Sequence, residues 1–196
     1  KIKYTKNSYS KASSDDLKFD TETTINDDIK KVADELGTAR NVYEYVKNTF
    51  NNEFYEGSRK GAVGTFEQLG GNDTDQASLL IGMLRYLDIP ARYATGTITI
   101  TPEQAVDITG TSDAENAGRM LGAQYKPVSR VTKNGELYCY KMQQTWVEAY
   151  VPYTDYRGAG NKSGENVWVS LDPSFKQIVV QEKNVTAEYS DMDKYI

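Results

Sequence analysis

The chain has 196 residues, with 23 Lys and Arg against 28 Asp and Glu, one cysteine and no histidine. Without histidine the chain has no Ser-His-Asp triad, no Cys-His pair and no histidine-ligated metal, and one cysteine forms neither an internal disulfide nor a multi-cysteine metal site. The net charge of -5 argues against a nucleic-acid partner, because proteins that bind a phosphate backbone present a basic patch.

The length fits one domain with a sizeable core. No run approaches the roughly 20 apolar residues that span a bilayer, so we expect no membrane insertion. The composition suits an extracellular bacterial protein and a cytosolic one equally, and localisation stays open at this point.

The first half of the chain is predicted to be mainly helical after a polar N-terminal segment. Residues 1–24 show no sustained apolar period, which predicts an extended arm or linker. Helical spacing follows over 29–36 and ends at Gly37, and a second helix begins after the capping residue Thr38. Residues 51–72 are expected to be irregular, because five glycines interrupt them.

The clearest predicted helix spans about 75–87, and it is apolar around much of its circumference. Such a helix belongs in a protein core. A β-strand rich in Tyr, Thr and Ile is predicted over 91–101. Two short helical patterns, around Pro102–Thr109 and Asp113–Leu121, then suggest an insertion between strands.

The second half of the chain is predicted to be β-rich. Asn134-Gly135 is a hairpin signal, joining strands near 125–133 and 136–151. A further strand is predicted over 167–171, and a short last one over 177–181.

These elements predict an α+β fold, with a central helix packed on an antiparallel β-sheet. The expected domain covers residues 25–183 and carries a helical insertion at 102–123. An arm of residues 1–24 precedes it, and a polar tail of residues 184–196 follows it.

Three motifs stand out in sequence order. The first is GNDTDQASLL at 71–80, which leads into LRYLDIPARY at 84–93. The second is QTWVEAYV at 144–151, and the third is VWVSLDPS at 167–174. Together they resemble the core of the transglutaminase-like superfamily, which shares its fold with papain-like thiol proteases. The resemblance covers roughly residues 38–180.

The resemblance implies roles for three positions. Active members place a nucleophilic cysteine where the core helix begins, a histidine on a following strand and an aspartate on the next. Those positions match Asp73, Gln144 and Asp172. A carboxylate is a poor acyl-transfer nucleophile, and an amide accepts no proton near neutral pH. Domains of large bacterial surface proteins also carry Gly-Asn-Asp here, so the resemblance implies a bacterial variant that lacks the catalytic cysteine and histidine.

The lone cysteine is not expected to replace the missing nucleophile. Strand alternation turns Cys139 away from Gln144, Trp146 and Glu148. A free cysteine behaves as a small hydrophobe, so we interpret Cys139 as a packing residue.

Several of the motif residues also have structural explanations. Asp73 with Gln76 three residues later suggests a capping box with Asp73 as the helix N-cap. Asp172 suggests a turn before Pro173, with a hydrogen bond to Gln144. Trp146 and Trp168 are expected in the core, and an exposed strand position is the simpler account of Glu148.

The leading functional hypothesis is a non-catalytic module of a larger bacterial secreted or surface protein, which binds a peptide, glycan or partner chain in the former active-site cleft. Its location would be extracellular or at the cell surface, with the cytoplasm as the alternative. Four residues are candidates for ligand contact: Asp75, Trp146, Glu148 and Tyr55.

Two other hypotheses stay open. One is an enzyme with rewired chemistry, in which Asp73 and Asp172 act as acid and base on a cell-wall or polysaccharide substrate. The other is a structural spacer. No cofactor is expected, although a hard cation such as calcium stays possible on a site that includes Asp75; the spacing of these aspartates is not that of an EF-hand.

Overall fold

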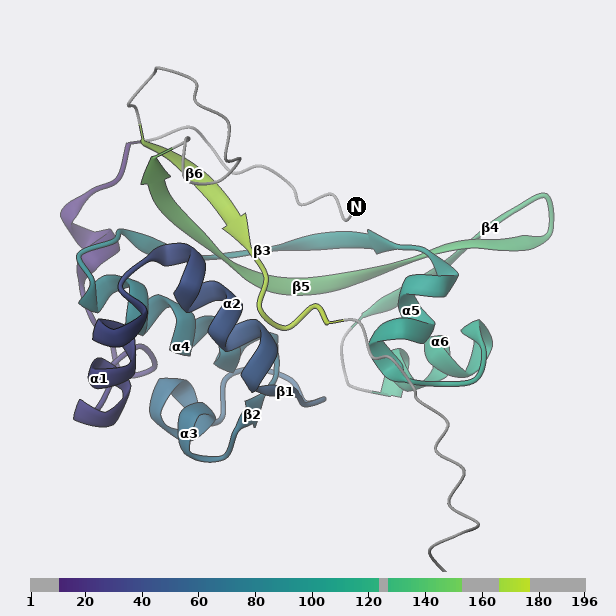
Figure 1. Cartoon of the computed structure of the whole chain (residues 1–196). Coiled ribbons are helices and arrows are strands. Elements are labelled where there is room, and N and C mark those ends of the chain that lie inside the picture. Colours follow the sequence, from purple (N-terminus) through teal and green to yellow (C-terminus); the bar gives the residue numbers. More distant parts are fainter. Residues whose placement is uncertain (1–10, 124–126, 153–165, 177–196) are drawn as a thin grey trace, which may run out of the picture.

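The computed structural model describes residues 11–123, 127–152 and 166–176. Its core is an antiparallel sheet with helices packed against it, as Figure 1 shows, and the predicted α+β fold is confirmed.

The first two helices begin and end where the sequence indicates. Helix α1 (Asp27–Leu36) ends at Gly37, whose φ of 66° is left-handed and favours glycine. Helix α2 (Ala39–Thr49) begins after Thr38, which accepts a hydrogen bond from the N–H of Asn41 at 3.2 Å. Each helix buries one apolar face against the core.

Helix α4 (Asp73–Tyr86) is the central helix that the sequence predicts. Twelve of its fourteen residues are buried. It packs on the sheet through β3 and β5 and on helices α1, α2 and α3, so apolar side chains are needed around most of its circumference.

The segment between α2 and α4 is more regular than expected. It contains helix α3 (Gly61–Glu67) and two short parallel strands, β1 (Asn51–Asn52) and β2 (Gly70–Gly71). The expectation of an irregular segment was wrong here, because a contact from outside the segment fixes the start of α3. The N–H groups of Lys60 and Gly61 both donate to the buried carboxylate of Asp75.

Strand β5 (Glu136–Pro152) is the centre of the sheet. Strand β3 (Ala91–Ile100) pairs with it along one side. Strands β4 (Val128–Lys133) and β6 (Asn166–Leu171) pair with its two ends along the other side. Residues 143–146 of β5 therefore face a gap between β4 and β6.

The β4–β5 hairpin turns at Asn134-Gly135, as predicted, and both residues have positive φ values, of 56° and 83°. Figure 1 shows this hairpin projecting beyond the rest of the sheet.

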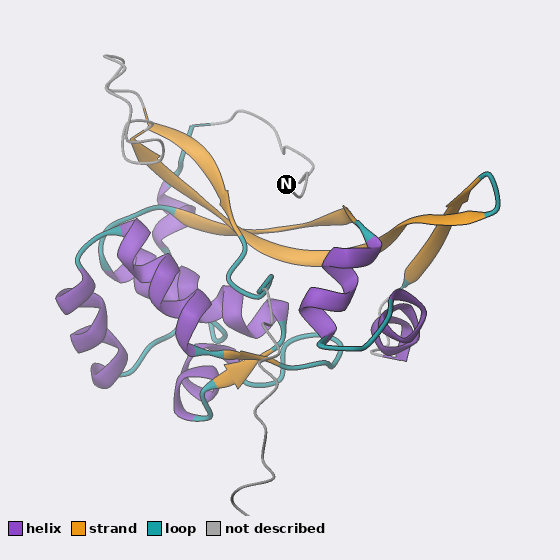
Figure 2. Ribbon diagram, turned by 45° about the vertical axis from the view of Figure 1, so that its right-hand side comes forward, coloured by secondary structure: helices purple, strands orange, loops and turns teal. Residues whose placement is uncertain are grey.

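The predicted insertion contains two helices, α5 (Pro102–Thr109) and α6 (Ala114–Ala123). Alternate residues of β5 serve two apolar clusters. Val147 and Ala149 pack with α4, whereas Met142 and Trp146 pack with α5 and α6. Figure 2 shows the two helical groups beside different stretches of the sheet.

The described part of the N-terminal segment, from residue 11, is fastened to α4. It contains the short helix η1 (Ser14–Leu17), and the guanidinium of Arg85 donates to the carbonyl of Asp16 at 3.1 Å. Gly82 permits this approach, because a Cβ there would lie 2.5 Å from the carbonyl oxygen of Thr23. Residues 1–10, the strand predicted at 177–181 and the tail at 184–196 lie outside the described residues.

We predict that Gly82→Ala lowers the free energy of unfolding by about 1–3 kcal/mol, because the added methyl meets backbone that has no room to move. Gly122→Ala in α6 is the matched control, since a Cβ there has no atom within 4 Å in the part of the chain that the structure describes. The control should gain up to about 0.8 kcal/mol from helix propensity. Urea unfolding measures both, and equal effects of the two substitutions would contradict the packing assigned to Gly82.

Candidate functional site

The N-terminus of α4 is capped by Asn72, and the prediction that Asp73 is the N-cap was wrong. The side chain of Asn72 accepts from the N–H of Asp75 at 2.9 Å, which leaves Asp73 as the first residue of the helix. The loop before the helix decides between them, because the Asn72 amide also donates to the carbonyls of Tyr55 and Gly57 at 2.8 and 2.7 Å. The side chain of an aspartate at position 72 would have no N–H group to donate to these carbonyls.

Gln76 does not complete a capping box. Its side-chain amide turns back instead and donates to the carbonyl of Gly71 at 2.7 Å. This contact ties the helix to the short strand β2.

Asp75 is fully buried beneath the loop that precedes α3. Its carboxylate accepts hydrogen bonds from two hydroxyls and three backbone N–H groups, which belong to Tyr55 at 2.5 Å, Ser58 at 2.7 Å, Gly61 at 3.0 Å, Arg59 at 3.1 Å and Lys60 at 3.2 Å. Burial and the bond to this carboxylate raise the pKa of Tyr55 well above its usual value. The candidate ligand residue Asp75 therefore organises the loop.

Asp73 reaches across to the sheet. Its Oδ2 atom accepts the backbone N–H of Thr145 at 2.7 Å, and the residue is only 4% exposed. Thr145 lies in the part of β5 that faces the gap between β4 and β6. The Asp73 carboxylate thus supplies the acceptor that a neighbouring strand would otherwise provide, since a backbone N–H inside a protein needs an acceptor.

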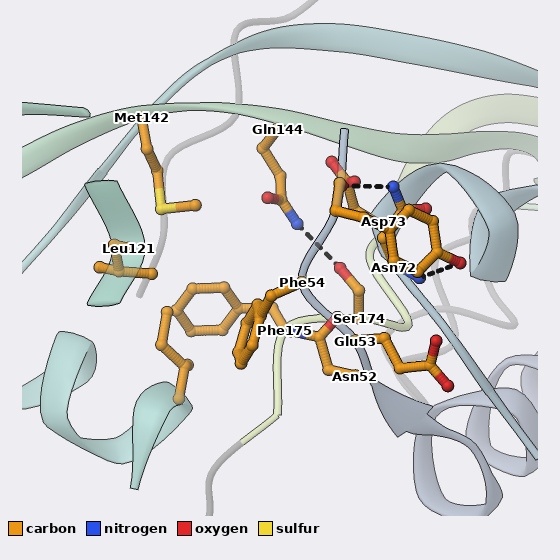
Figure 3. Close-up of a pocket in the computed structure, with 12 residues that line it drawn as sticks. Asn52, Glu53, Phe54, Asn72, Asp73, Leu121, Met142, Gln144, Ser174 and Phe175 are labelled. Atoms are coloured by element: carbon orange, nitrogen blue, oxygen red, sulfur yellow. Dashed lines mark hydrogen bonds between the residues drawn. The ribbon is translucent and has the colours of Figure 1, made fainter. Parts of the chain in front are cut away.

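Gln144 joins β5 to the turn after β6. Its Nε2 atom donates to Oδ2 of Asp172 at 3.0 Å and to Oγ of Ser174 at 2.8 Å, and all three residues are buried. Figure 3 shows the amide pointing at Ser174. The predicted hydrogen bond between Gln144 and Asp172 is confirmed.

Asp172 forms the predicted turn. Its Oδ1 atom accepts the N–H groups of Ser174 and Phe175 at 3.1 and 3.2 Å and the hydroxyl of Ser174 at 2.8 Å. Both carboxylate oxygens of Asp172 are therefore used within the protein.

A pocket opens where these segments meet (Figure 3). Its cavity volume is about 30 Å³, which holds a few water molecules and is too small for a sugar ring. Asp73, Gln144 and Ser174 supply polar lining. Helices α5 and α6 close one side with the apolar side chains of Ile108 and Leu121. The loop after β1 contributes the rings of Phe54 and Tyr55, and the turn after β6 contributes that of Phe175.

The structure brings some of the predicted site residues together and separates others. Tyr55 lines the pocket with Asp73 and Gln144, whereas Trp146 and Glu148 lie farther along β5 and do not line it. Trp146 is fully buried, as predicted for a core residue.

Glu148 is buried, so the expectation of an exposed strand position was wrong. It is 3% exposed and pairs with the guanidinium of Arg92 on the neighbouring strand at 2.8 Å. That guanidinium also lies over the ring of Trp168 at 4.0 Å, and Trp168 itself is half-buried. The cross-strand cation makes burial of the acid tolerable.

Cys139 is a buried free cysteine, in agreement with its interpretation as a packing residue. The β3–β5 register runs without interruption from Tyr140 to Ala149. Cys139 therefore faces the side of the sheet opposite to Gln144.

Sequence reasoning missed several residues of the pocket. Asn72 had a signal, because asparagine is as good an N-cap as aspartate. Ser174 had a weaker signal, because it lies two residues after Asp172, where an Asx turn places a hydrogen-bonded residue. Phe54 and Phe175 had none, since only the folded chain brings them to the same place.

Within the described residues, no group of three or more acidic or cysteine side chains is arranged to hold a metal ion. Among the helices that the structure describes, none combines the length and apolar character that a membrane span requires.

The family model of the Transglutaminase-like superfamily core matches residues 23–173. The chain belongs to this superfamily.

Two solved structures are similar to the chain. Both are of the periplasmic domain of TgpA from Pseudomonas aeruginosa, one of them bound to ethylmercury. The identities are 19% and 18%, each with a TM-score of 0.42. The matches cover 82% of this chain but only 47% and 46% of the TgpA chains, so this chain spans less than half of their length. A search of the curated proteins finds no match.

We predict that Asp75→Asn lowers the free energy of unfolding by about 3 kcal/mol, because an amide NH2 would face N–H groups that now donate to a carboxylate. Asp28→Asn on the exposed surface of α1 is the control and should change it by less than about 0.5 kcal/mol. Denaturant unfolding monitored by tyrosine and tryptophan fluorescence provides the measurement. A loss below 1 kcal/mol for Asp75→Asn would show that these bonds do not hold the loop.

Lys176 gives a prediction about pH. Its Nζ atom is buried and has no hydrogen-bond partner in the described part of the chain. Burial, with a smaller contribution from Lys47, lowers its pKa from 10.5 to about 8. The unfolded chain therefore binds this proton more readily than the folded chain between pH 10.5 and 8, and stability falls as the pH falls through that window.

Lys176→Met should accordingly raise the free energy of unfolding at pH 7 and change it much less at pH 10.5, where the folded lysine is neutral and the unfolded lysine is only half protonated. Lys31→Met on the exposed surface of α1 is the control. Urea titrations at the two pH values test this prediction, and a Lys176→Met variant that is less stable at pH 7 would contradict it.

Proposed function

We propose that the chain is a non-catalytic transglutaminase-like module, in which Asp73 and Gln144 stand where active members have cysteine and histidine. The absence of histidine from the whole chain supports this reading. So does the position of Cys139 on the far face of the sheet.

The observation that carries the proposal is the pair of hydrogen bonds from the Gln144 amide. A general base must offer a lone pair to the nucleophile. Gln144 instead points its NH2 group at Asp172 and Ser174, and all of these groups are buried. The arrangement uses the family's site to join two segments of backbone.

A peptide segment of a partner protein is the ligand class that the pocket supports best. The small cavity volume, about 30 Å³, favours a single small side chain over a sugar ring. The rim mixes aromatic rings with amides and acids, as peptide-binding sites do: Phe54, Tyr55, Phe175, Asn52 and Glu53. We also propose that the module belongs to a larger secreted or surface protein of a bacterium, because domains of such proteins carry the same Gly-Asn-Asp motif.

The rewired enzyme has less support. Acid–base chemistry with two carboxylates requires each to reach a substrate. Asp73 and Asp172 are each 4% exposed, and both accept hydrogen bonds from backbone N–H groups.

We predict that the purified chain incorporates no amine into glutamine-containing peptides and hydrolyses no peptide or polysaccharide above the buffer rate. Asp73→Ala and Cys139→Ala are the matched variants, and neither should change the measured rates. Turnover that persists in Cys139→Ala and disappears in Asp73→Ala would establish carboxylate chemistry. Turnover that disappears in Cys139→Ala would establish thiol chemistry.

We predict that a peptide selected from a random library on the wild-type chain binds Phe54→Ala at least tenfold more weakly, because this ring forms part of the pocket rim. Phe19→Ala is the control, since Phe19 is 46% exposed and does not line the pocket. Fluorescence anisotropy measures both affinities. A library that yields no binder would favour the spacer hypothesis, and binders that Phe54→Ala leaves unaffected would contradict the proposed site.

A further inference from the structure

A second depression shares no lining residue with the pocket just described. It runs between helix α6 and the base of the β4–β5 hairpin, which Figures 1 and 2 show beside one another, and its volume is about 250 Å³. We call it the α6–β4 groove. Tyr140 of β5 lines its interior, and the Tyr140 hydroxyl donates to the carbonyl of Ala114 at 2.7 Å.

Two glycines of α6 line the groove, and packing explains only one of them. A Cβ at Gly118 would lie within 2.7 Å of three atoms of the Tyr140 side chain, so this position has no room for a larger residue. A Cβ at Gly122 would have no atom of the described residues within 4 Å, and its φ is not in the left-handed region. Glycine within a helix is less stable than alanine by about 0.5–1 kcal/mol. The fold therefore gives no reason for Gly122, whereas an open groove does.

Strand β4 forms the other side of the groove and is an edge strand. Its neighbour in the sheet is β5, and the described residues place no strand on its outer edge. Val128 and Arg130, two residues apart on one face of β4, line the groove. An unpaired edge beside a helix accepts an extended peptide as an added strand, with alternate side chains against the helix.

The charge of this region indicates the kind of peptide. Residues 114–142 contain five Lys and Arg against two Glu, a net charge of +3 in a chain whose total is -5. Arg119 and Arg130 line the groove together with Glu115, so two positive charges stand against one negative charge in its lining. Arg119 pairs with Glu115 at 2.9 Å, but both are exposed, so the pair contributes little and opens readily. No ion pair of Arg130 occurs among the described residues.

We propose that the α6–β4 groove binds an extended acidic segment of a partner protein, which adds a strand to the outer edge of β4. Side chains of the segment lie against the bare backbone at Gly122, and its carboxylates face Arg119 and Arg130. This site is separate from the pocket that holds Gln144, and neither proposal depends on the other.

The test uses the full chain and two fluorescein-labelled octapeptides, one alternating Val and Glu and one alternating Val and Lys. Fluorescence anisotropy should show saturable binding of the Val-Glu peptide, weakened by added salt, and at least tenfold weaker binding of the Val-Lys peptide. Absence of saturable Val-Glu binding up to 1 mM peptide overturns the proposal, as does equal binding of both peptides.

Two pairs of variants locate the site. Gly122→Leu fills the groove and Arg130→Glu reverses its charge, and each should weaken Val-Glu binding at least tenfold. Ala123→Leu and Arg40→Glu make the same changes at exposed positions outside the groove lining, and they should stay within twofold of the wild-type affinity. Circular dichroism establishes that all four variants are folded. Binding that survives Gly122→Leu, or is lost in Phe54→Ala instead, overturns the assignment to the groove.

Hydrogen exchange distinguishes strand addition from simple charge attraction. Saturating Val-Glu peptide should slow amide exchange of β4 residues that are unpaired in the free chain, and it should leave exchange in α1 unchanged. Unchanged exchange throughout β4 would overturn the added-strand geometry.

Discussion

The site depends on the hydrogen bonds that the buried carboxylate of Asp75 accepts. This carboxylate accepts hydrogen bonds from the loop over residues 55–61, and so it fixes both the start of α3 and the wall of the pocket at Tyr55. A buried carboxylate is stable only when its oxygens are satisfied, and here backbone N–H groups and hydroxyls satisfy them. Packing on the sheet and on α1, α2 and α3 fixes the position of α4. The hydrogen bonds of Asp75 therefore hold the loop at a fixed place relative to this helix.

The gap in the sheet explains why Asp73 contacts the backbone of β5. Between β4 and β6 the backbone of β5 lacks a neighbouring strand. Asp73 accepts the N–H of Thr145 that has no strand partner there, and Gln144 holds the turn after β6 through Asp172 and Ser174. Every one of these contacts links segments that are distant in sequence. These contacts join the start of α4, strand β5 and the turn after β6 beside a small pocket with both polar and aromatic lining.

The sequence predicts the elements whose signal is local. The apolar circumference of α4, the turn at Asn134-Gly135 and the bond between Gln144 and Asp172 all follow from patterns within a few residues or from a matched motif. The errors have a common cause, which is contact from elsewhere in the fold. Helix α3 starts where Asp75 collects its N–H groups, and Glu148 is buried because Arg92 lies opposite it. The N-cap shifts to Asn72 because the loop above accepts from its amide.

The central claim is that Asp73, Gln144 and Asp172 are held by hydrogen bonds within the protein, and hydrogen exchange at two N–H groups of the site tests that claim most directly. NMR follows the backbone N–H of Thr145 and the side-chain NH2 of Gln144 in the free protein. The account predicts that the Thr145 N–H exchanges as slowly as the amides of α4 and that the Gln144 NH2 exchanges far more slowly than that of the exposed Gln143. Exchange of both groups at the rate of exposed amides would show that these hydrogen bonds do not persist in solution and would contradict the account.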